Sequence, residues 1–134
     1  MPERKIIHIA AALIDDGQGR LLLVRKAGTR WFMQAGGKIE KGESPRSALR
    51  RELREEIGLS ISDGRLHYLG RFSAIAANEP DHLVAAEVFR VRTLHMPEMH
   101  SEIEEAVWVD RNAAAALPLA PLTRDHIIPL SFTL

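Results

Sequence analysis

The sequence predicts a single mixed α/β domain of the α+β kind, in which strands outnumber helices. Short runs of apolar and β-branched residues recur along the chain between turn residues, as they do in a sheet. One segment near the middle has instead the periodicity of an amphipathic helix, with a capping residue at each end. The 134 residues, 46% of them apolar, are enough for one domain, residues 1–134, with its own core.

The expected strands follow from the apolar runs. Residues 6–14 are almost continuously apolar and predict a central strand buried on both faces. A turn at residues 15–19 leads to a second strand at residues 20–24, so the two strands are expected to form a hairpin. Gly36 and Gly37 predict a turn, because glycine allows unusual backbone angles. Further strands are expected at residues 31–34, 66–77, 83–91 and 107–109, with a hairpin turn at residues 78–81.

The main helix is expected from about Pro45 to Ile57. Ser44 is a suitable N-cap, and proline is favoured at the first helical position. Gly58 is well placed to end the helix. Shorter helical turns are expected at residues 113–116 and from Leu122.

The composition excludes several classes of protein. Without cysteine, the chain has no disulfide framework, thiolate zinc site or cysteine nucleophile, which is compatible with a cytoplasmic protein. Eighteen basic residues balance eighteen acidic ones, which argues against a protein that mainly grips nucleic acid but leaves room for a small nucleotide. No apolar run approaches the roughly 18 residues of a membrane span, and residues 1–5 predict the approach to a first strand rather than a signal peptide.

The expected helix concentrates negative charge beside its apolar stripe. At about 100° per residue, Glu52, Glu55 and Glu56 share one arc of the helix. Like charges at this spacing repel, and they lie toward the helix end where the dipole disfavours anions. A hard divalent cation such as Mg²⁺ would offset this repulsion. The alternative is a solvated helix whose glutamates pair with arginines, namely Arg50, Arg51 and Arg54.

This segment resembles the Nudix box, G-x5-E-x7-R-E-U-x-E-E-x-G-U with U a bulky aliphatic residue. All nine fixed positions match within residues 37–59. The remainder of the chain agrees more loosely with the family in length and strand order. The matching residues are Gly37, Glu43, Arg51, Glu52, Leu53, Glu55, Glu56, Gly58 and Leu59.

The resemblance implies a fold, a reaction and a set of roles. The implied fold is an α/β/α sandwich with a mixed sheet between helices. The implied reaction is Mg²⁺- or Mn²⁺-dependent hydrolysis of a nucleoside diphosphate linked to another group, by attack of water at phosphorus. Glu52, Glu55 and Glu56 would bind the metal and polarise the water, with Glu56 and Glu52 as the first choices for ligands and the Gly37 carbonyl as a further one. The implied role of Glu43 and Arg51 is an ion pair that fixes the loop against the helix.

Three residues outside the acidic arc complete the expected site. Glu102 is the first candidate for an additional base in a later loop, with Glu104, Glu105 and Glu79 as weaker ones; a solvated loop carboxylate is the alternative. Arg25 and Lys38 are expected to contact phosphate, although a surface charge is the alternative for each.

Within the family, this sequence is most similar to compact MutT-like members. Residues 73–77 lack the proline typical of ADP-ribose hydrolases and the tyrosine typical of dinucleoside polyphosphate hydrolases. We therefore expect a nucleoside triphosphate pyrophosphohydrolase that acts on a small nucleotide, natural or oxidised, as a monomer or homodimer without nucleic-acid or membrane partners. Two alternatives stay open: a pyrophosphatase of ADP-ribose or another nucleotide sugar, and a nucleotide-binding module without catalysis.

Overall fold

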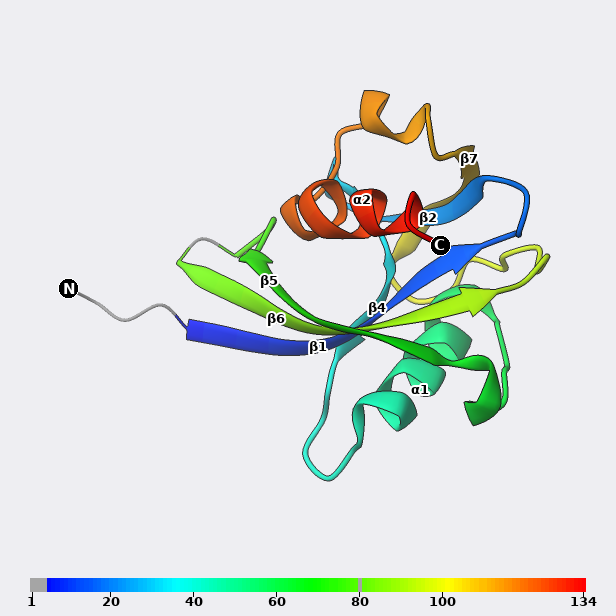
Figure 1. Ribbon diagram of the computed structural model, residues 1–134. Helices are drawn as coiled ribbons and strands as arrows, with labels where there is room; N and C mark the ends of the chain where they lie inside the picture. The colour runs from blue at the N-terminus through cyan, green and yellow to red at the C-terminus, as the bar shows by residue number, and fades with distance from the viewer. Residues whose placement is uncertain (1–4, 80) are drawn as a thin grey trace.

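The computed structural model describes residues 5–79 and 81–134, and its described part is an α/β/α sandwich. A mixed sheet lies between helix α1 on one face and the C-terminal helical segment on the other (Figure 1). The predicted fold class is therefore confirmed. The strands are β1 (Lys5–Asp15), β2 (Arg20–Lys26), β3 (Phe32–Met33), β4 (Ala35–Lys38), β5 (His67–Ile75), β6 (His82–Arg92) and β7 (Ile103–Asp110).

Strand β1 is the centre of the sheet. It pairs along its whole length with β6, in parallel, while its other edge is shared between two antiparallel partners. Residues 9–12 pair with β4, and only Asp15 at the end of β1 pairs with Leu21 of β2. The strands follow the order β3-β2-β1-β6-β5, with β4 on β1 and β7 on β2.

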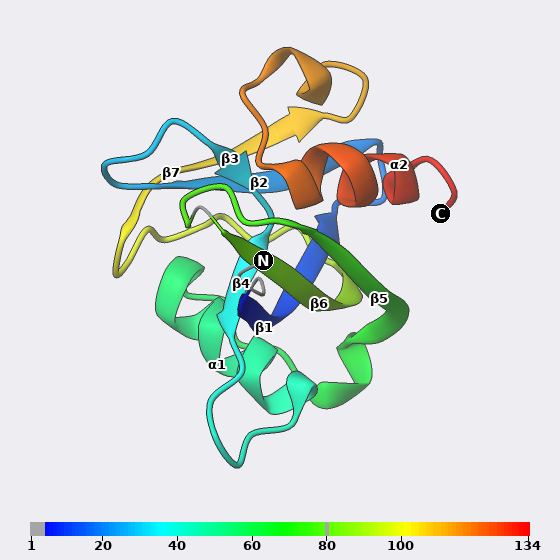
Figure 2. The ribbon, with the colours of Figure 1, turned by 90° about the vertical axis from the view of Figure 1, so that its left-hand side faces the viewer.

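Alternate residues of the central strands build two separate cores. Side chains at even positions of β1 and β2, such as Ile14 and Leu22, pack with α1. Side chains at odd positions, such as Leu13 and Leu23, pack with the C-terminal segment. This division follows from the two-residue period of a strand, and Figure 2 shows the two helices on opposite sides of the sheet.

Helix α1 (Pro45–Ile57) has the predicted bounds because its signals are local. The Ser44 hydroxyl oxygen accepts a hydrogen bond from the Ser47 amide at 3.1 Å, and Pro45 occupies the first helical position. Gly58 ends the helix with φ of 68°. The C-terminal segment consists of a π-helical turn (Thr123–Ile127) and α2 (Ile128–Ser131), and two short 3₁₀ helices cover Asp63–Arg65 and Ala114–Ala116.

Three expectations about the strands need correction. The hairpin of the first two strands is limited to their adjoining ends, because β4 occupies the edge of β1 that β2 leaves. The first half of β1 is not buried on both faces: Ile6 is 55% exposed, since the helices cover only the second half. Gly36 and Gly37 do not form the expected turn but belong to strand β4, in which Gly36 has a φ of 138°. A Cβ on Gly36 would lie 2.2 Å from the Ala10 carbonyl oxygen, so glycine allows the two strands to approach.

The expected turn at residues 78–81 connects β5 and β6, although Pro80 lies outside the described residues, as do residues 1–4 of the expected N-terminal approach. Within the described residues, none of the helices has the length and apolar character that crossing a bilayer requires.

Replacing Gly36 by alanine is expected to destabilise the protein by at least about 2 kcal/mol. The new Cβ would overlap the Ala10 carbonyl, and the backbone would be strained at a φ of 138°. Urea unfolding measures the loss. Gly28→Ala is the matched control, because Gly28 also has positive φ but a Cβ there would meet no other part of the protein within 4 Å; it should cost only about 1 kcal/mol. Equal losses in the two variants would contradict the close approach.

Candidate active site

The candidate site begins where helix α1 meets strand β4. Glu56 is buried, with 6% of its surface exposed, and its Oε1 accepts a hydrogen bond from the Gly36 amide at 2.9 Å. Burial raises the pKa of Glu56 to about 7, and the nearby carboxylates Glu52 and Glu55 add to the rise, whereas the Gly36 amide and Lys26 oppose it. A buried carboxylate with such a pKa is typical of a functional site.

Glu52 lies one helical turn before Glu56 and faces the next glycine of β4. Its carboxylate packs directly on the Gly37 backbone, since a Cβ at Gly37 would lie 2.6 Å from the Glu52 Cδ atom. The Glu52 side chain is 16% exposed. The two glycines therefore leave space for two carboxylates side by side, where any larger residue at position 37 would displace one of them.

Arg51 joins the loop before the helix to the acidic face. Its Nε and Nη2 donate to the two Glu43 oxygens at 2.8 and 2.9 Å, which makes a bidentate pair. Its Nη1 donates to Glu52 at 2.8 Å and to Glu55 at 3.2 Å, and Nη2 also donates to the Lys38 carbonyl at 3.1 Å. These bonds lower the pKa of Glu43 to about 2 and raise the pKa of Arg51 above its ordinary value.

The solvated-helix alternative describes only part of this acidic face. Glu55 is 53% exposed and is paired with Arg51, as that alternative expects. Arg50 instead donates to the Ile61 carbonyl. Glu56 makes no ion pair with any described residue and is held by a backbone amide inside the protein. Burial of this one carboxylate is what distinguishes the helix from a solvated one.

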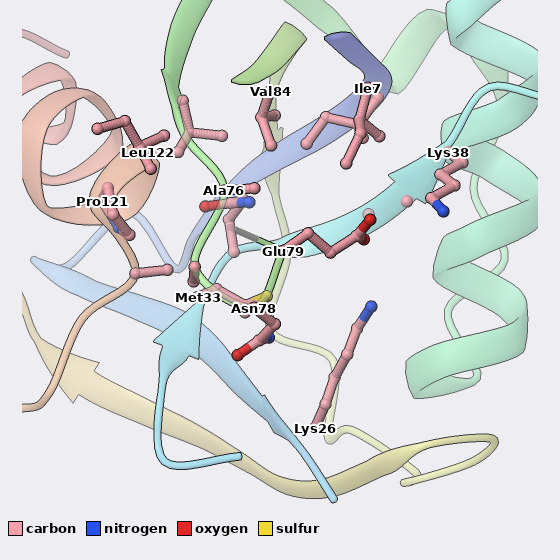
Figure 3. Close-up of a pocket in the computed structure, with 17 residues that line it drawn as sticks. Ile7, Lys26, Met33, Lys38, Ala76, Asn78, Glu79, Val84, Pro121 and Leu122 are labelled. Atoms are coloured by element: carbon pink, nitrogen blue, oxygen red, sulfur yellow. The ribbon is translucent and has the colours of Figure 1, made fainter. Parts of the chain in front are cut away.

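A cleft opens beside these carboxylates (Figure 3). At one end, Lys26 and Lys38 extend their ammonium groups into it, and Glu79 reaches toward the same region. Neither lysine forms an ion pair with a described residue. The remaining wall is mostly apolar and comes from β1, β3, β5, β6 and the start of the C-terminal segment. Its residues include Ile7, Ile9, Met33, Gln34, Ile75, Asn78, Val84, Pro121 and Leu122.

Of the two predicted phosphate contacts, Lys38 lines the cleft and Arg25 does not. The Arg25 Nη2 donates to Glu105 at 2.7 Å, and its Nη1 lies 3.5 Å from Glu104 on the same strand, β7. Lys26, which the sequence pattern did not single out, occupies the cleft instead. A β-bulge between Arg25 and Lys26 shifts the pairing with β7, and no local sequence signal reveals it.

The candidates for an additional base are dispersed. Glu102 is exposed in the loop before β7, and its carbonyl accepts from Ala27. This loop packs against the end of α1, since the His100 amide donates to the Glu56 carbonyl. The Glu102 side chain does not line the cleft, whereas Glu79, a weaker candidate, does. The role of Glu102 stays a prediction.

A second residue that the sequence pattern did not single out, Gln34, places a polar group in the apolar part of the cleft. It is 7% exposed, and its Oε1 accepts a hydrogen bond of 2.7 Å from the Thr123 hydroxyl. Thr123 begins the π-helical turn, and it is fully buried. The only sequence signal for Gln34 is that it is a glutamine inside an apolar run. Its hydrogen-bond partner, Thr123, lies 89 residues away in the sequence.

The donor set fits a hard divalent cation. Carboxylate and carbonyl oxygens are the ligands that Mg²⁺ and Mn²⁺ accept, and Glu52 and Glu56 lie against the backbone of Gly36 and Gly37 without a larger side chain between. Among residues 5–79 and 81–134, no three acidic or histidine side chains are already gathered around one point. Arg51 instead holds Glu52 and Glu55 in ion pairs.

Comparison with known proteins finds relatives that cover most of this chain. A family model described as NUDIX domain matches residues 6–130. The chain is 33% identical over 128 residues to a CTP pyrophosphohydrolase of Escherichia coli K12, covering 87% of this chain and 85% of that protein. It is 29% identical over 123 residues to an 8-oxo-dGTP diphosphatase of Haemophilus influenzae, covering 89% and 87%. A MutT protein from Methanosarcina mazei shares the fold with a TM-score of 0.80 at 21% identity, covering 99% and 97%.

The Glu43–Arg51 pair should stabilise the protein in a pH-dependent way. The pKa of Glu43 is lowered from 4.5 to about 2, so its stabilisation is present above pH 4.5 and is lost as the pH falls toward 2. Glu43→Gln should therefore lower the urea midpoint at pH 7, and its difference from the wild type should shrink between pH 4.5 and pH 2.

Glu40→Gln is the control for this measurement, because the Glu40 carboxylate is 68% exposed and lies 3.9 Å from Arg51. It should change the midpoint little at any pH. A Glu43→Gln effect that stayed constant down to pH 2 would show that the ion pair is not its cause.

Proposed function

The chain belongs to the Nudix family of hydrolases, and on this premise we propose that it cleaves nucleoside triphosphates to a nucleoside monophosphate and pyrophosphate. The observation that carries the proposal is the meeting of the buried Glu56 and the partly buried Glu52 with the Gly36–Gly37 backbone, beside a cleft with two lysines. Acidic and basic groups at one end and an apolar wall at the other suit a molecule with a phosphate chain and a base.

We assign the metal-binding role to Glu52, Glu55, Glu56 and the Gly37 carbonyl, with Mg²⁺ or Mn²⁺ as the cofactor. When bound there, the ion would neutralise phosphate charge and lower the pKa of a water. The Gly36 amide binds one carboxylate oxygen of Glu56, which leaves the second oxygen for the ion. Arg51 and Glu43 hold the loop against the helix and act as positioning residues.

The chain's own cations and apolar residues bind the substrate in this proposal. The Lys26 and Lys38 ammonium groups, which extend into the cleft, would face the phosphates and offset part of their charge during attack at phosphorus. Met33 and Leu122 belong to the wall that would pack against the nucleoside and exclude water. The Gln34 carboxamide lies in the same wall, where it can donate to a carbonyl of the base.

The names of the relatives support triphosphates over the alternatives. The two relatives described above are named for CTP and 8-oxo-dGTP, and each aligns over more than four fifths of both chains. Hydrolysis of ADP-ribose or a nucleotide sugar is the second candidate. A module without catalysis is less well supported, because every box glutamate is present. The absence of a nucleic-acid partner, a cytoplasmic location and a monomer or homodimer stay predictions.

The first experiment is a hydrolysis screen with Mg²⁺ or Mn²⁺. It covers the natural NTPs and dNTPs, 8-oxo-dGTP, ADP-ribose and several nucleotide sugars, with products separated by chromatography. Pyrophosphate and a monophosphate, absent with EDTA, would support the proposal and rank the bases. AMP with a sugar phosphate would replace it by the second candidate. No product from any substrate would favour the binding module.

Glu56→Gln should lower kcat by at least about 100-fold, because the neutral amide cannot bind the metal as an anion. Circular dichroism should show an unchanged fold, since the glutamine oxygen still accepts from Gly36. Glu98→Gln is the matched control, as Glu98 is 73% exposed outside the helix, and it should retain activity. Near-normal turnover by Glu56→Gln would remove Glu56 from the site.

Lys26→Gln should raise the KM for a triphosphate by roughly tenfold, because it removes one cation that faces the phosphates. Arg25→Gln is the neighbouring control. It should affect stability more than KM, since Arg25 is held by Glu105 and Glu104. Steady-state kinetics with urea unfolding separates the two effects. The reverse result, with KM raised only by Arg25→Gln, would restore Arg25 as the phosphate contact.

A further inference from the structure

A second cleft lies at the far end of β1, and four arginines line it. Arg20 begins β2, Arg90 and Arg92 end β6, and Arg111 follows β7. The cleft measures about 250 Å³, which is space for roughly eight waters. It shares no lining residue with the cleft beside α1. Asp15 lies at the base of this cleft. It is five residues along β1 from Ala10, which pairs with Gly37, and five strand residues span roughly 16 Å.

The carboxylates at this cleft only partly balance its arginines. Asp15 accepts from Arg90 Nε at 2.9 Å and from Arg92 Nε at 3.2 Å, and Asp16 accepts from Arg20 Nε at 2.7 Å. Two carboxylates thus face three guanidinium groups before the fourth arginine is considered. Both aspartates are buried, so they bind the arginines from the protein side of the cleft.

The fourth arginine adds a charge without a carboxylate partner among the described residues. Arg111 Nη1 donates to the Ser131 carbonyl at 3.0 Å, and its guanidinium lies 5.1 Å from the centre of the Phe132 ring. The side chains at the cleft therefore carry two positive charges in excess, in a chain whose formal net charge is zero. Such a local field attracts anions although the whole protein does not.

The arginines also keep hydrogen-bond donors available. The guanidinium groups of Arg20 and Arg92 bind their aspartates only through Nε, and within the described residues their Nη atoms have no hydrogen-bond partner. Their side chains are 53% and 60% exposed. A guanidinium group fixed at Nε presents its remaining N–H groups as a fork, the arrangement that matches phosphate oxygens.

We propose that this arginine cleft is a second anion-binding site, separate from the candidate active site, that takes the phosphate chain of a diphosphate or triphosphate. The chemistry is the same whether the chain is free pyrophosphate or part of a nucleotide. The proposal rests on the arginine geometry and not on the hydrolytic activity, so it can fail or hold independently of the proposed function.

The test is calorimetric titration of the intact protein with pyrophosphate, and separately with CTP, at low ionic strength in EDTA so that no turnover occurs. Arg20→Gln/Arg92→Gln should weaken binding at least tenfold without changing hydrolysis. Arg71→Gln/Arg124→Gln is the matched control, because these arginines are 63% and 61% exposed and each also pairs with one carboxylate. It removes the same charge elsewhere and should change affinity less than threefold.

The two ligands identify the source of the phosphates: tighter binding of pyrophosphate supports a free diphosphate, and tighter binding of CTP supports a nucleotide. Equal losses in both double variants would overturn the proposal, as would the absence of binding by the wild type. The amide signals of Gly17 and Gly19, which line the arginine cleft, should shift in NMR spectra on adding pyrophosphate. Shifts confined to Gly36 and Gly37 would place the anion beside α1 and would also overturn it.

Discussion

The structure depends on one buried contact, in which the Gly36 amide donates to the Glu56 carboxylate. Burying a carboxylate costs several kcal/mol unless hydrogen bonds or charges compensate. Here a single backbone amide, a nearby lysine and a raised pKa provide that compensation. The contact joins α1 to β4, and β4 is paired with the central strand. The helix that carries the acidic residues is thereby held at a defined place on the sheet.

Arg51 gives this acidic face its present arrangement. By binding Glu43 on the loop and both Glu52 and Glu55 on the helix, it reduces the repulsion among carboxylates that the helix would otherwise suffer. In the proposed metal site, the same guanidinium would compete with a divalent cation for Glu52 and Glu55. Glu56, which is outside its reach, is free of that competition. The site thus combines one carboxylate positioned by the backbone with two positioned by an arginine.

Charge in this protein is neutral in sum but separated in space. Carboxylates and two lysines gather at the middle of β1, and arginines gather where β1 ends. The central strand separates the two regions because its length exceeds that of the helix packed against it. A net charge of zero therefore says little about the local fields that a small anion would meet.

What the sequence determined by itself was local. The bounds of α1 follow from Ser44, Pro45 and Gly58, each of which acts on its nearest neighbours, and the spacing of the three glutamates follows from the helix. Tertiary structure decided what depends on distant partners. Gly36 belongs to a strand only because β1 lies beside it, and Lys26 rather than Arg25 enters the cleft at a bulge against β7. Periodicity describes a segment's own geometry, whereas register and burial depend on which residues the fold brings opposite.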